Sequence, residues 1–273
     1  MTKFADLHIH TQYSDSTLSP QDVVTEALER QLSCVAITDH DTVKGVKPTQ
    51  QAAANSELEV IAAIELSSEL QGKDIHILGY FLDCDNEALK SALSKMRSAR
   101  VKRIQEMIEK LKTFGVNNVG LEDVCALSLD SVGRPHLAAV LKEKGWVSSI
   151  PEAFQKYLGE DCPVYVSKYK ISPFDAITLI KEAKGLAVMA HPMATSRDEL
   201  IPSLIEAGLQ GIEAYYPNYS DTAIQYYLGI AKKHNLLVTG GSDGHGKAKP
   251  NTFIGKMRIP YELVEKMKEA CGK

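Results

Sequence analysis

The chain has 273 residues, of which 44% are hydrophobic and 24% charged, and its formal net charge is -4. This composition is typical of a soluble globular protein and excludes a general attraction to nucleic acid or to an anionic membrane. No apolar stretch approaches the roughly 20 residues of a membrane-spanning helix. The five cysteines form no Cys-x-x-Cys pair, and no basic stretch followed by an apolar run opens the chain. We therefore expect a cytoplasmic protein.

Short apolar runs alternate with helical patterns at the start of the chain. The pattern predicts a strand at 4–9, a helix after Ser19-Pro20, a second strand at 34–38 and a helical stretch that ends near residue 55. A serine followed by proline is typical of a helix N-terminus, because serine caps the free backbone amides and proline fits the first helical position. The alternation indicates repeated βα units.

The segment VIAAIELSSELQGKDIHILGYFL predicts a hairpin, since two strand patterns flank the turn at residues 71–73. Three later strands are predicted in GLAVMAHP, QGIEAYYP and LLVTGGSD, with helices between them. One of these helices follows Ser172-Pro173, which repeats the earlier start signal. Together with the first two strands, these patterns predict seven strands.

The pattern changes between residues 85 and 164, where helical spacing dominates and no strand is evident. The stretch NEALKSALSKMRSARVKRIQEMIEKLKTFG predicts a long helix, and RPHLAAVLKEKG and PEAFQKYLG predict shorter ones. Gly115 and Gly145 are expected to end helices. We therefore predict an α/β barrel domain formed by 1–84 and 165–273, with a helical insertion, or lid, over 85–164.

Histidines and acids gather where the predicted strands end. In DLHIH the two-residue period of a strand places Asp6, His8 and His10 on one face, which cannot be ordinary core. The carboxyl ends of the parallel strands of a barrel meet at one rim, so separate motifs converge there. The predicted set has six imidazoles and three carboxylates: His8, His10, Asp15, His40, Glu65, His76, His191, Asp243 and His245.

This set predicts a metal cluster. A single ion takes about four to six ligands, so nine donors indicate two or three divalent ions with at least one bridging carboxylate. Any one of the histidines could instead be a structural residue, but burying so many polar groups without a partner would cost roughly 1 to 3 kcal/mol each. Asp39 and Asp41 flank His40 and are expected to orient it from outside the ligand set.

The motif VGRPH lies in the predicted insertion and places Arg134 and His136 at a helix start. A guanidinium grips phosphate through two hydrogen bonds, and a helix N-terminus also favours an anion. The pair suits phosphate capture; the alternative is an exposed arginine and a histidine without a role. The basic run Arg97, Arg100, Lys102 and Arg103 predicts a solvated helix face, or else a short track for phosphate.

The motifs DLHIHTQYSD, AITDHDT, IELSS, DIHILGY, AHP and GGSDGH, in this order, resemble the PHP (polymerase and histidinol phosphatase) family over nearly all of residues 3–250. The resemblance implies a distorted barrel of seven βα units and a trinuclear cluster of manganese, zinc or iron. It further implies three ligand groups, namely His8, His10, Glu65 and Asp243 for one ion, Glu65, His76 and His191 for the second, and Asp15, His40 and His245 for the third.

The insertion with GRPH also resembles the TrpH-like branch of nucleotide phosphoesterases, which act on nucleoside 3',5'-bisphosphates, nucleoside monophosphates or RNA 5' ends. There the match identifies Arg134 and His136 as phosphate contacts. We therefore predict hydrolysis of phosphomonoesters of small nucleotides by a metal-bridged hydroxide, with Glu65, His40 and Arg134 as catalytic residues. A 5'-3' exoribonuclease acting on short RNA is the alternative. An amidohydrolase and a non-catalytic domain that binds metal or nucleotide are the rivals from other classes.

Overall fold

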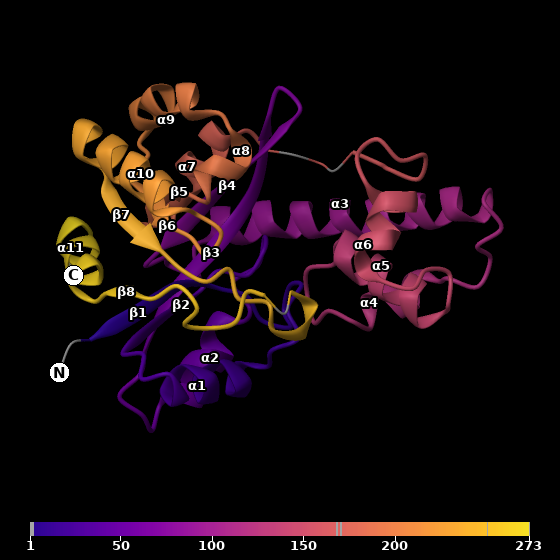
Figure 1. Ribbon diagram of the computed structural model, residues 1–273, viewed down its shortest axis with the longest axis horizontal. Helices are drawn as coiled ribbons and strands as arrows, with labels where there is room; N and C mark the ends of the chain where they lie inside the picture. The colour runs from indigo at the N-terminus through magenta and orange to yellow at the C-terminus, as the bar shows by residue number, and fades with distance from the viewer. Residues whose placement is uncertain (1–2, 168, 170, 250, 273) are drawn as a thin grey trace.

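The computed structural model describes residues 3–167, 169, 171–249 and 251–272. Its centre is one curved sheet with the strand order β7-β6-β5-β4-β3-β2-β1-β8, which forms a nearly closed barrel (Figure 1). The strands are β1 Phe4–Ile9, β2 Cys34–Ile37, β3 Glu59–Leu70, β4 Lys73–Tyr80, β5 Leu186–Met189, β6 Gly211–Tyr215, β7 Leu237–Gly240 and β8 Ile259–Pro260. The seven predicted strands are all present, and the two-residue β8 is an addition that its sequence did not signal.

The strand directions bring the rim loops together. β1, β2 and β3 are parallel, as are β5, β6 and β7, whereas β4 runs against both of its neighbours. The predicted hairpin joins β3 to β4, and Gln71 and Gly72 in its turn both have positive φ, at 52° and 80°. The barrel closes where the His10 amide donates to Gly244 O at 3.0 Å and the Gly244 amide donates to His8 O at 3.2 Å.

Helices cover the outside of the barrel. They are α1 Pro20–Glu29, α2 Val46–Ala53, α7 Pro173–Glu182, α8 Pro192–Thr195, α9 Ile201–Ala207, α10 Asp221–His234 and α11 Glu262–Ala270, with short 3-10 turns at Asp198–Leu200 and Gly246–Ala248. Ser19 and Ser172 cap α1 and α7 as predicted. Each hydroxyl accepts a hydrogen bond from the backbone amide three residues further along the chain, at 3.1 Å. No described helix has the length and apolar character needed to cross a membrane.

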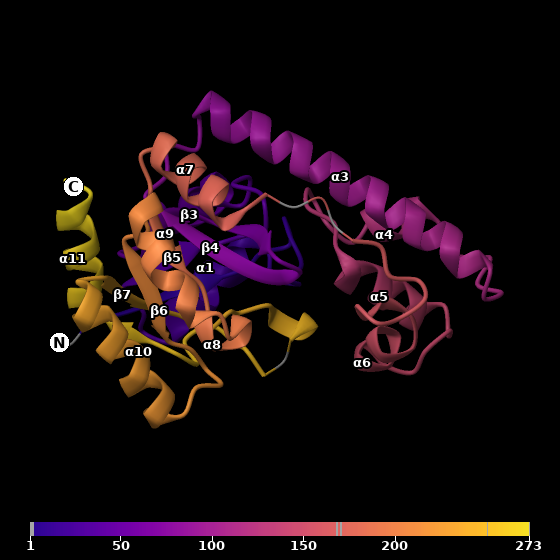
Figure 2. The same cartoon turned by 90° about the horizontal axis from the view of Figure 1, so that it is seen from above.

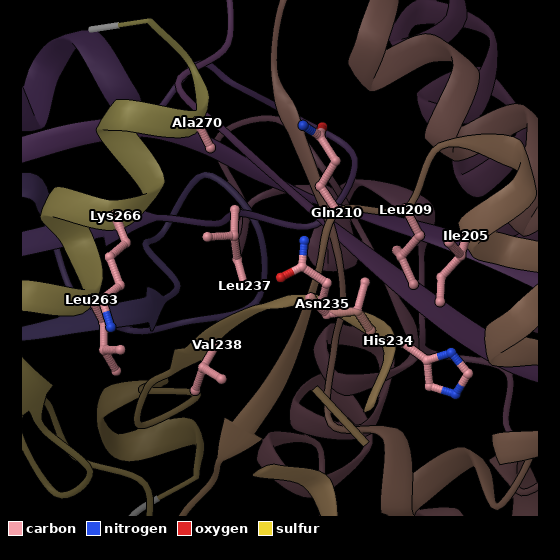
Figure 3. Close-up of a pocket in the computed structure, with 11 residues that line it drawn as sticks. Ile205, Leu209, Gln210, His234, Asn235, Leu237, Val238, Leu263, Lys266 and Ala270 are labelled. Carbon is pink, nitrogen blue, oxygen red and sulfur yellow. The ribbon is translucent and has the colours of Figure 1, made fainter. Parts of the chain in front are cut away.

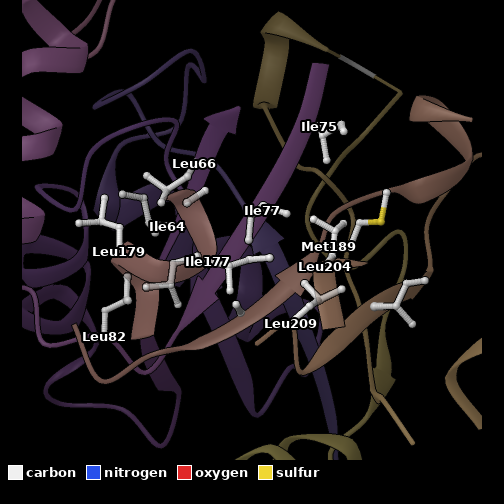
Figure 4. Packing of buried hydrophobic residues seen from close by; sticks show 14 of the residues in the cluster. Ile64, Leu66, Ile75, Ile77, Leu82, Ile177, Leu179, Met189, Leu204 and Leu209 are labelled. Atoms are coloured by element: carbon white, nitrogen blue, oxygen red, sulfur yellow. The ribbon is translucent and has the colours of Figure 1, made fainter. Parts of the chain in front are cut away.

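The alternation of β3 explains how one strand serves both the core and the site. Ile64 and Leu66 point outward and pack with Ile77 of β4, Ile177 of α7 and other residues of one buried cluster (Figure 4). Glu65, between them, therefore points to the opposite face, inside the barrel. The packing of the outer face fixes the register of the strand, and with it the position of this carboxylate.

The insertion is helical, as predicted, and consists of α3 Glu87–Lys112, α4 Leu121–Cys125, α5 Arg134–Glu143, α6 Ile150–Ala153 and a π-helical turn at Phe154–Leu158. These helices stand at one side of the barrel, with α3 leading out to them (Figure 2). The end of α3 packs with α5 in a hydrophobic cluster of the insertion itself, whereas its beginning packs on the barrel through Leu89, Leu93 and Met96. Gly115 and Gly145 have φ of 83° and 77° and follow helix ends, as predicted.

Candidate metal centre

Glu65 lies at the centre of the predicted ligand set. Imidazole nitrogens lie 2.7 to 3.4 Å from its two carboxylate oxygens. They belong to five residues: His8, His10, His40, His76 and His191. Oε1 faces His76 and His191, whereas Oε2 faces the other three, so the two oxygens of one carboxylate address different parts of the site.

Asp243 and Asp15 connect the remaining residues of the set to this centre. Asp243 Oδ1 lies 3.2 Å from His10 Nε2 and 3.7 Å from His8 Nε2. Asp15 Oδ1 lies 3.1 Å from His245 Nε2 and 3.7 Å from His10 Nδ1. The structure therefore brings all nine predicted residues into one cluster at the rim.

The donors form three groups whose ligand atoms lie within 4.8 Å of one another: His10, Asp15, His40 and His245; His8, His10 and Asp243; and His40, Glu65 and His76. His10 and His40 each belong to two groups, which differs from the division implied by the resemblance. His191 is 3.0 Å from Glu65 but lies outside these groups. The division of the ligands among individual ions stays a prediction.

The chemistry of the donors fits divalent metal ions. Imidazole nitrogens and carboxylate oxygens suit manganese, zinc and iron. His76 Nε2 and His191 Nδ1 are buried, and neither has a hydrogen-bond partner among the described residues. Buried polar atoms are nearly always satisfied in native proteins, so unpaired nitrogens on two rings that contact Glu65 indicate that the site is built to hold cations.

The electrostatics of the site agree with this interpretation. Burial alone would raise the pKa of Glu65, but His40, His76 and His8 hold it well below its ordinary value. Burial likewise opposes ionisation of Asp15, whose pKa nevertheless stays well below its ordinary value because His245 and His40 are close. Burial lowers the pKa of His40 well below 6.5, which favours the ring form that offers a lone pair to a metal ion.

Two residues of the set have unusual backbone conformations. His191 has a φ of 27° and Asp243 a φ of 49°, although neither is glycine. Such conformations persist only when the surrounding structure enforces them, and they are concentrated at functional sites. The loops after β5 and β7 are therefore shaped to present these two side chains to the rim.

The sequence analysis missed Glu213, which is fully buried on β6. His8 Nδ1 donates to its Oε1 at 2.9 Å, and the His191 amide donates to its Oε2 at 2.8 Å. Glu213 thus turns the Nε2 atom of His8 toward Glu65 and fixes the start of the His191 loop. An acid between Ile212 and Ala214 in an otherwise apolar strand was the available signal.

Tyr216 and Lys249 are two further contacts that the sequence analysis missed. The Tyr216 hydroxyl donates to Asp243 Oδ2 at 2.8 Å, and Lys249 Nζ lies 3.3 Å from the same oxygen. Asp243 Oδ1 remains directed to the imidazoles of His8 and His10. The two contacts therefore orient the carboxylate from its outer side.

Asp39 supports the site from outside the donor groups. Its carboxylate accepts from the Thr11 amide at 2.7 Å, the Thr11 hydroxyl at 2.7 Å and the Ser14 hydroxyl at 2.6 Å. These bonds fix the loop that carries Asp15. Asp6 accepts from the Ser242 amide at 2.9 Å and so anchors the loop that carries Asp243.

Asp41 is bound by Arg100 and Ser67, so the expectation that Asp39 and Asp41 orient the His40 ring was wrong. Nε of Arg100 donates to Asp41 Oδ2 at 2.8 Å, and Nη1 donates to Val132 O at 3.2 Å. The Ser67 amide donates to Asp41 Oδ1 at 2.7 Å. Arg100 thus links α3, the loop after β2 and the start of VGRPH.

A cavity of about 150 Å³ lies between the rim and the insertion. Asp15, His40 and His76 line it from the barrel, and Arg100, Arg103 and Arg134 line it from the insertion. The expectation of a solvated basic face was therefore wrong for part of the run: Arg103 is only 6% exposed. A helical pattern could not show which side of α3 faces the rim.

His136 is buried at the start of α5. Its Nδ1 accepts a hydrogen bond from the Gly133 amide at 3.0 Å, so the ring caps the helix. Arg134 instead lines the cavity, with Nη1 donating to Leu158 O at 3.3 Å. The role of His136 as a phosphate contact stays a prediction.

Another cavity, of about 520 Å³, lies at the opposite end of the barrel (Figure 3). Leu237 and Val238 line it from the amino end of β7, together with Leu263 and Lys266 of α11. None of the predicted site residues lines it. Its position separates it from the chemistry of the rim.

An α/β barrel that gathers imidazoles and carboxylates at the carboxyl ends of its strands has the architecture of a metal-dependent hydrolase. The PHP domain model matches residues 6–95. The chain is 32% identical to a 5'-3' exoribonuclease of Haemophilus influenzae, over 90% of this chain and 91% of that protein. It is 31% identical to the 3',5'-nucleoside bisphosphate phosphatase of Chromobacterium violaceum, over 92% of this chain and 90% of that protein. The chain belongs to the PHP family.

A solved structure agrees with this assignment. The crystal structure of a proposed metal-dependent phosphoesterase from Bifidobacterium adolescentis matches with a TM-score of 0.89 and 31% sequence identity. The match covers 97% of this chain and 95% of that one. Barrel and insertion therefore occur together in a related protein.

Proposed function

We propose that the protein is a metal-dependent phosphoesterase that hydrolyses phosphomonoesters of small nucleotides, such as a nucleoside 3',5'-bisphosphate or monophosphate. The observation that carries the proposal is the cavity in which predicted metal ligands face three arginines. Ions engage one side of a phosphoryl group, and guanidinium groups neutralise the oxygens on the other. The similarity to the 3',5'-nucleoside bisphosphate phosphatase of Chromobacterium violaceum supports this assignment.

The metal ligands of the proposal are the nine residues of the rim cluster, with two or three ions of manganese, zinc or iron. When bound, such ions polarise phosphoryl oxygens and lower the pKa of water. Glu65 is proposed as the bridging ligand, because its two oxygens address separate sets of imidazoles. His40 lines the cavity, and its Nδ1 lies 3.1 Å from Glu65 Oε2 in the same centre.

The proposal gives the insertion the role of a lid. The insertion has a hydrophobic cluster of its own. This cluster supports a division into a barrel domain, formed by 1–84 and 165–273, and a lid formed by 85–164. Residues 1, 2 and 273 at the ends, together with 168, 170 and 250 in the second barrel segment, lie outside the described residues. Arg134 extends from the lid into the cavity and is proposed to bind a substrate phosphate.

A second candidate is a 5'-3' exoribonuclease that acts on short RNA. The similarity to the Haemophilus influenzae exoribonuclease favours it. The net charge of -4 argues against a long polyanion, which usually calls for many cationic contacts.

Phosphate release from several substrates tests the choice. The protein, supplemented with manganese or zinc, is assayed at fixed salt with AMP, adenosine 3',5'-bisphosphate and a 5'-phosphorylated oligoribonucleotide. We expect the mononucleotides to be preferred. A strong preference for the oligonucleotide that falls steeply as salt rises would establish the exoribonuclease instead, and no turnover of any of them would refute the phosphoesterase.

A further inference from the structure

A short segment of the insertion, residues 128–131 between α4 and α5, runs against the loop that joins β1 to α1. The amides of its second and last residues donate to Gln12 O and Tyr13 O, each at 2.9 Å. These two carbonyls belong to the stretch between His10 and Asp15, which are both members of the rim cluster. The insertion therefore holds the backbone that carries two of the predicted ligands.

Asp130, within this segment, reaches the loop after β2. The Thr42 hydroxyl donates to its Oδ2 at 2.6 Å, and Lys44 Nζ donates to its Oδ1 at 2.5 Å. Arg97 of α3 adds a third contact, with Nε 3.3 Å from Oδ2. The Asp130 side chain is only 7% exposed, so these charge-assisted bonds are largely shielded from water. Because Thr42 follows His40 by two residues, Asp130 fixes the loop that begins at this predicted ligand.

The two loops that meet at segment 128–131 carry most of one donor group. That group has four members, and three of them lie in these loops or at their start, namely His10, Asp15 and His40. The fourth, His245, is joined to the first loop where its carbonyl accepts from the Thr17 amide at 3.3 Å. The spacing of the four donors therefore depends on how the two loops are held.

We propose that Asp130 is a positioning residue for the ion of this donor group, because it holds the loops of Asp15 and His40 at the spacing that the ion needs. The other two groups take their carboxylates from the barrel, since Glu65 lies within β3 and Asp243 follows β7. One ion of the cluster thus depends on the docking of the insertion, and the others do not. This inference rests on the metal centre of the proposed function.

Equilibrium dialysis of the full chain against graded free manganese or zinc counts the ions bound at each concentration. In Asp130→Ala, one step of the binding curve is expected to move to about 10- to 100-fold higher free metal, while the remaining steps stay at their wild-type positions. Thr42→Val should move the same step, and the double variant should move it no further than Asp130→Ala, because both changes break one contact. Asp123→Ala is the matched control, because Asp123 pairs with Lys144 inside the insertion, and it should leave the curve unchanged.

Wild-type binding curves in Asp130→Ala and Thr42→Val would overturn the inference. An equal shift of every step would also overturn it, because a general loss of structure does not select one ion. If Asp130→Ala lacks a cooperative melting transition, the curve of Thr42→Val decides. Wild-type protein that binds less than one equivalent would refute the proposed metal centre itself, which is a separate outcome.

Discussion

Glu213 orients two residues of the rim from inside the barrel. It accepts from His8 Nδ1 and from the His191 amide, and it is fully buried. A group that holds a ligand histidine fixes both its tautomer and its angle, so its loss weakens the site without removing a ligand.

Glu213→Gln is therefore expected to lower metal affinity by about 10- to 100-fold, because a neutral amide orients His8 less firmly than a carboxylate. Equilibrium dialysis against manganese or zinc measures the effect. Glu206→Gln, on the outer helix α9, is the control. An affinity equal to that of the wild type would remove Glu213 from the support of the site.

Arg134→Ala tests the other wall of the cavity. A charged hydrogen bond contributes about 1.5 to 3 kcal/mol, so kcat/KM is expected to fall roughly 10- to 150-fold. The metal content should remain that of the wild type, because Arg134 belongs to none of the donor groups. Wild-type kinetics in Arg134→Ala would show that VGRPH has only a structural role.

The sequence could predict the ligands but not all of their supports. His8 and His10 follow the period of a strand, and His40, His191 and Asp243 follow strand ends, so a barrel topology was enough to unite them. Glu213 and Tyr216 support the site through particular side-chain contacts, which the spacing of residues along the sequence does not predict. The same holds for Arg103, because the register of α3 against the barrel decides which cations face the rim.

Helix α5 illustrates how an element can depend on a histidine. The ring of His136 is buried, and Nδ1 accepts from the Gly133 amide at the helix start. Burial lowers the pKa of His136 below its ordinary value of 6.5, so the folded protein holds the ring neutral. The helix ends marked by Ser19, Ser172, Gly115 and Gly145 could be predicted from the sequence, because helix capping depends on neighbouring residues. The contact of the His136 ring with the Gly133 amide could not be predicted in this way.

The pH dependence of stability follows from that shift. Below pH 6.5 the unfolded chain takes up a proton on His136 that the folded chain resists, so the free energy of unfolding falls as pH falls. His136→Gln is expected to flatten this dependence between the ordinary pKa of histidine and the lower folded value. Urea unfolding at a series of pH values measures it, with the half-buried His234 of α10 replaced by Gln as the control. Equal slopes in wild type and His136→Gln would contradict this role of His136.

At the scale of the whole molecule, α3 connects the two parts of the fold. Its beginning packs on the barrel, and its end packs in the insertion. Arg100 reinforces the connection through Asp41 and Val132. The barrel and insertion were predictable from the change of period along the chain, whereas this junction depends on long-range contacts. The two-residue β8 could not be predicted from the sequence either, because its one neighbour in the sheet is β1, at the other end of the chain.

Arg100→Ala is expected to destabilise the protein by about 3 kcal/mol, because it leaves the buried Asp41 carboxylate unpaired. Denaturant unfolding measures the loss, with Lys102→Ala on the same helix as the control. The double variant Arg100→Ala with Asp41→Asn should recover part of the stability. Equal stability of Arg100→Ala and wild type would show that the junction does not depend on this pair.

If the rim cluster is a metal centre that hydrolyses phosphate esters, turnover must depend on the metal that is bound there. The most direct measurement is phosphate release from adenosine 3',5'-bisphosphate as a function of the bound equivalents of manganese or zinc, determined by elemental analysis of the same samples. We predict that turnover rises with metal and saturates at two or three equivalents per chain, and that Glu65→Gln lowers both metal content and turnover. Full turnover with less than one bound equivalent, or none at saturation, would contradict the account.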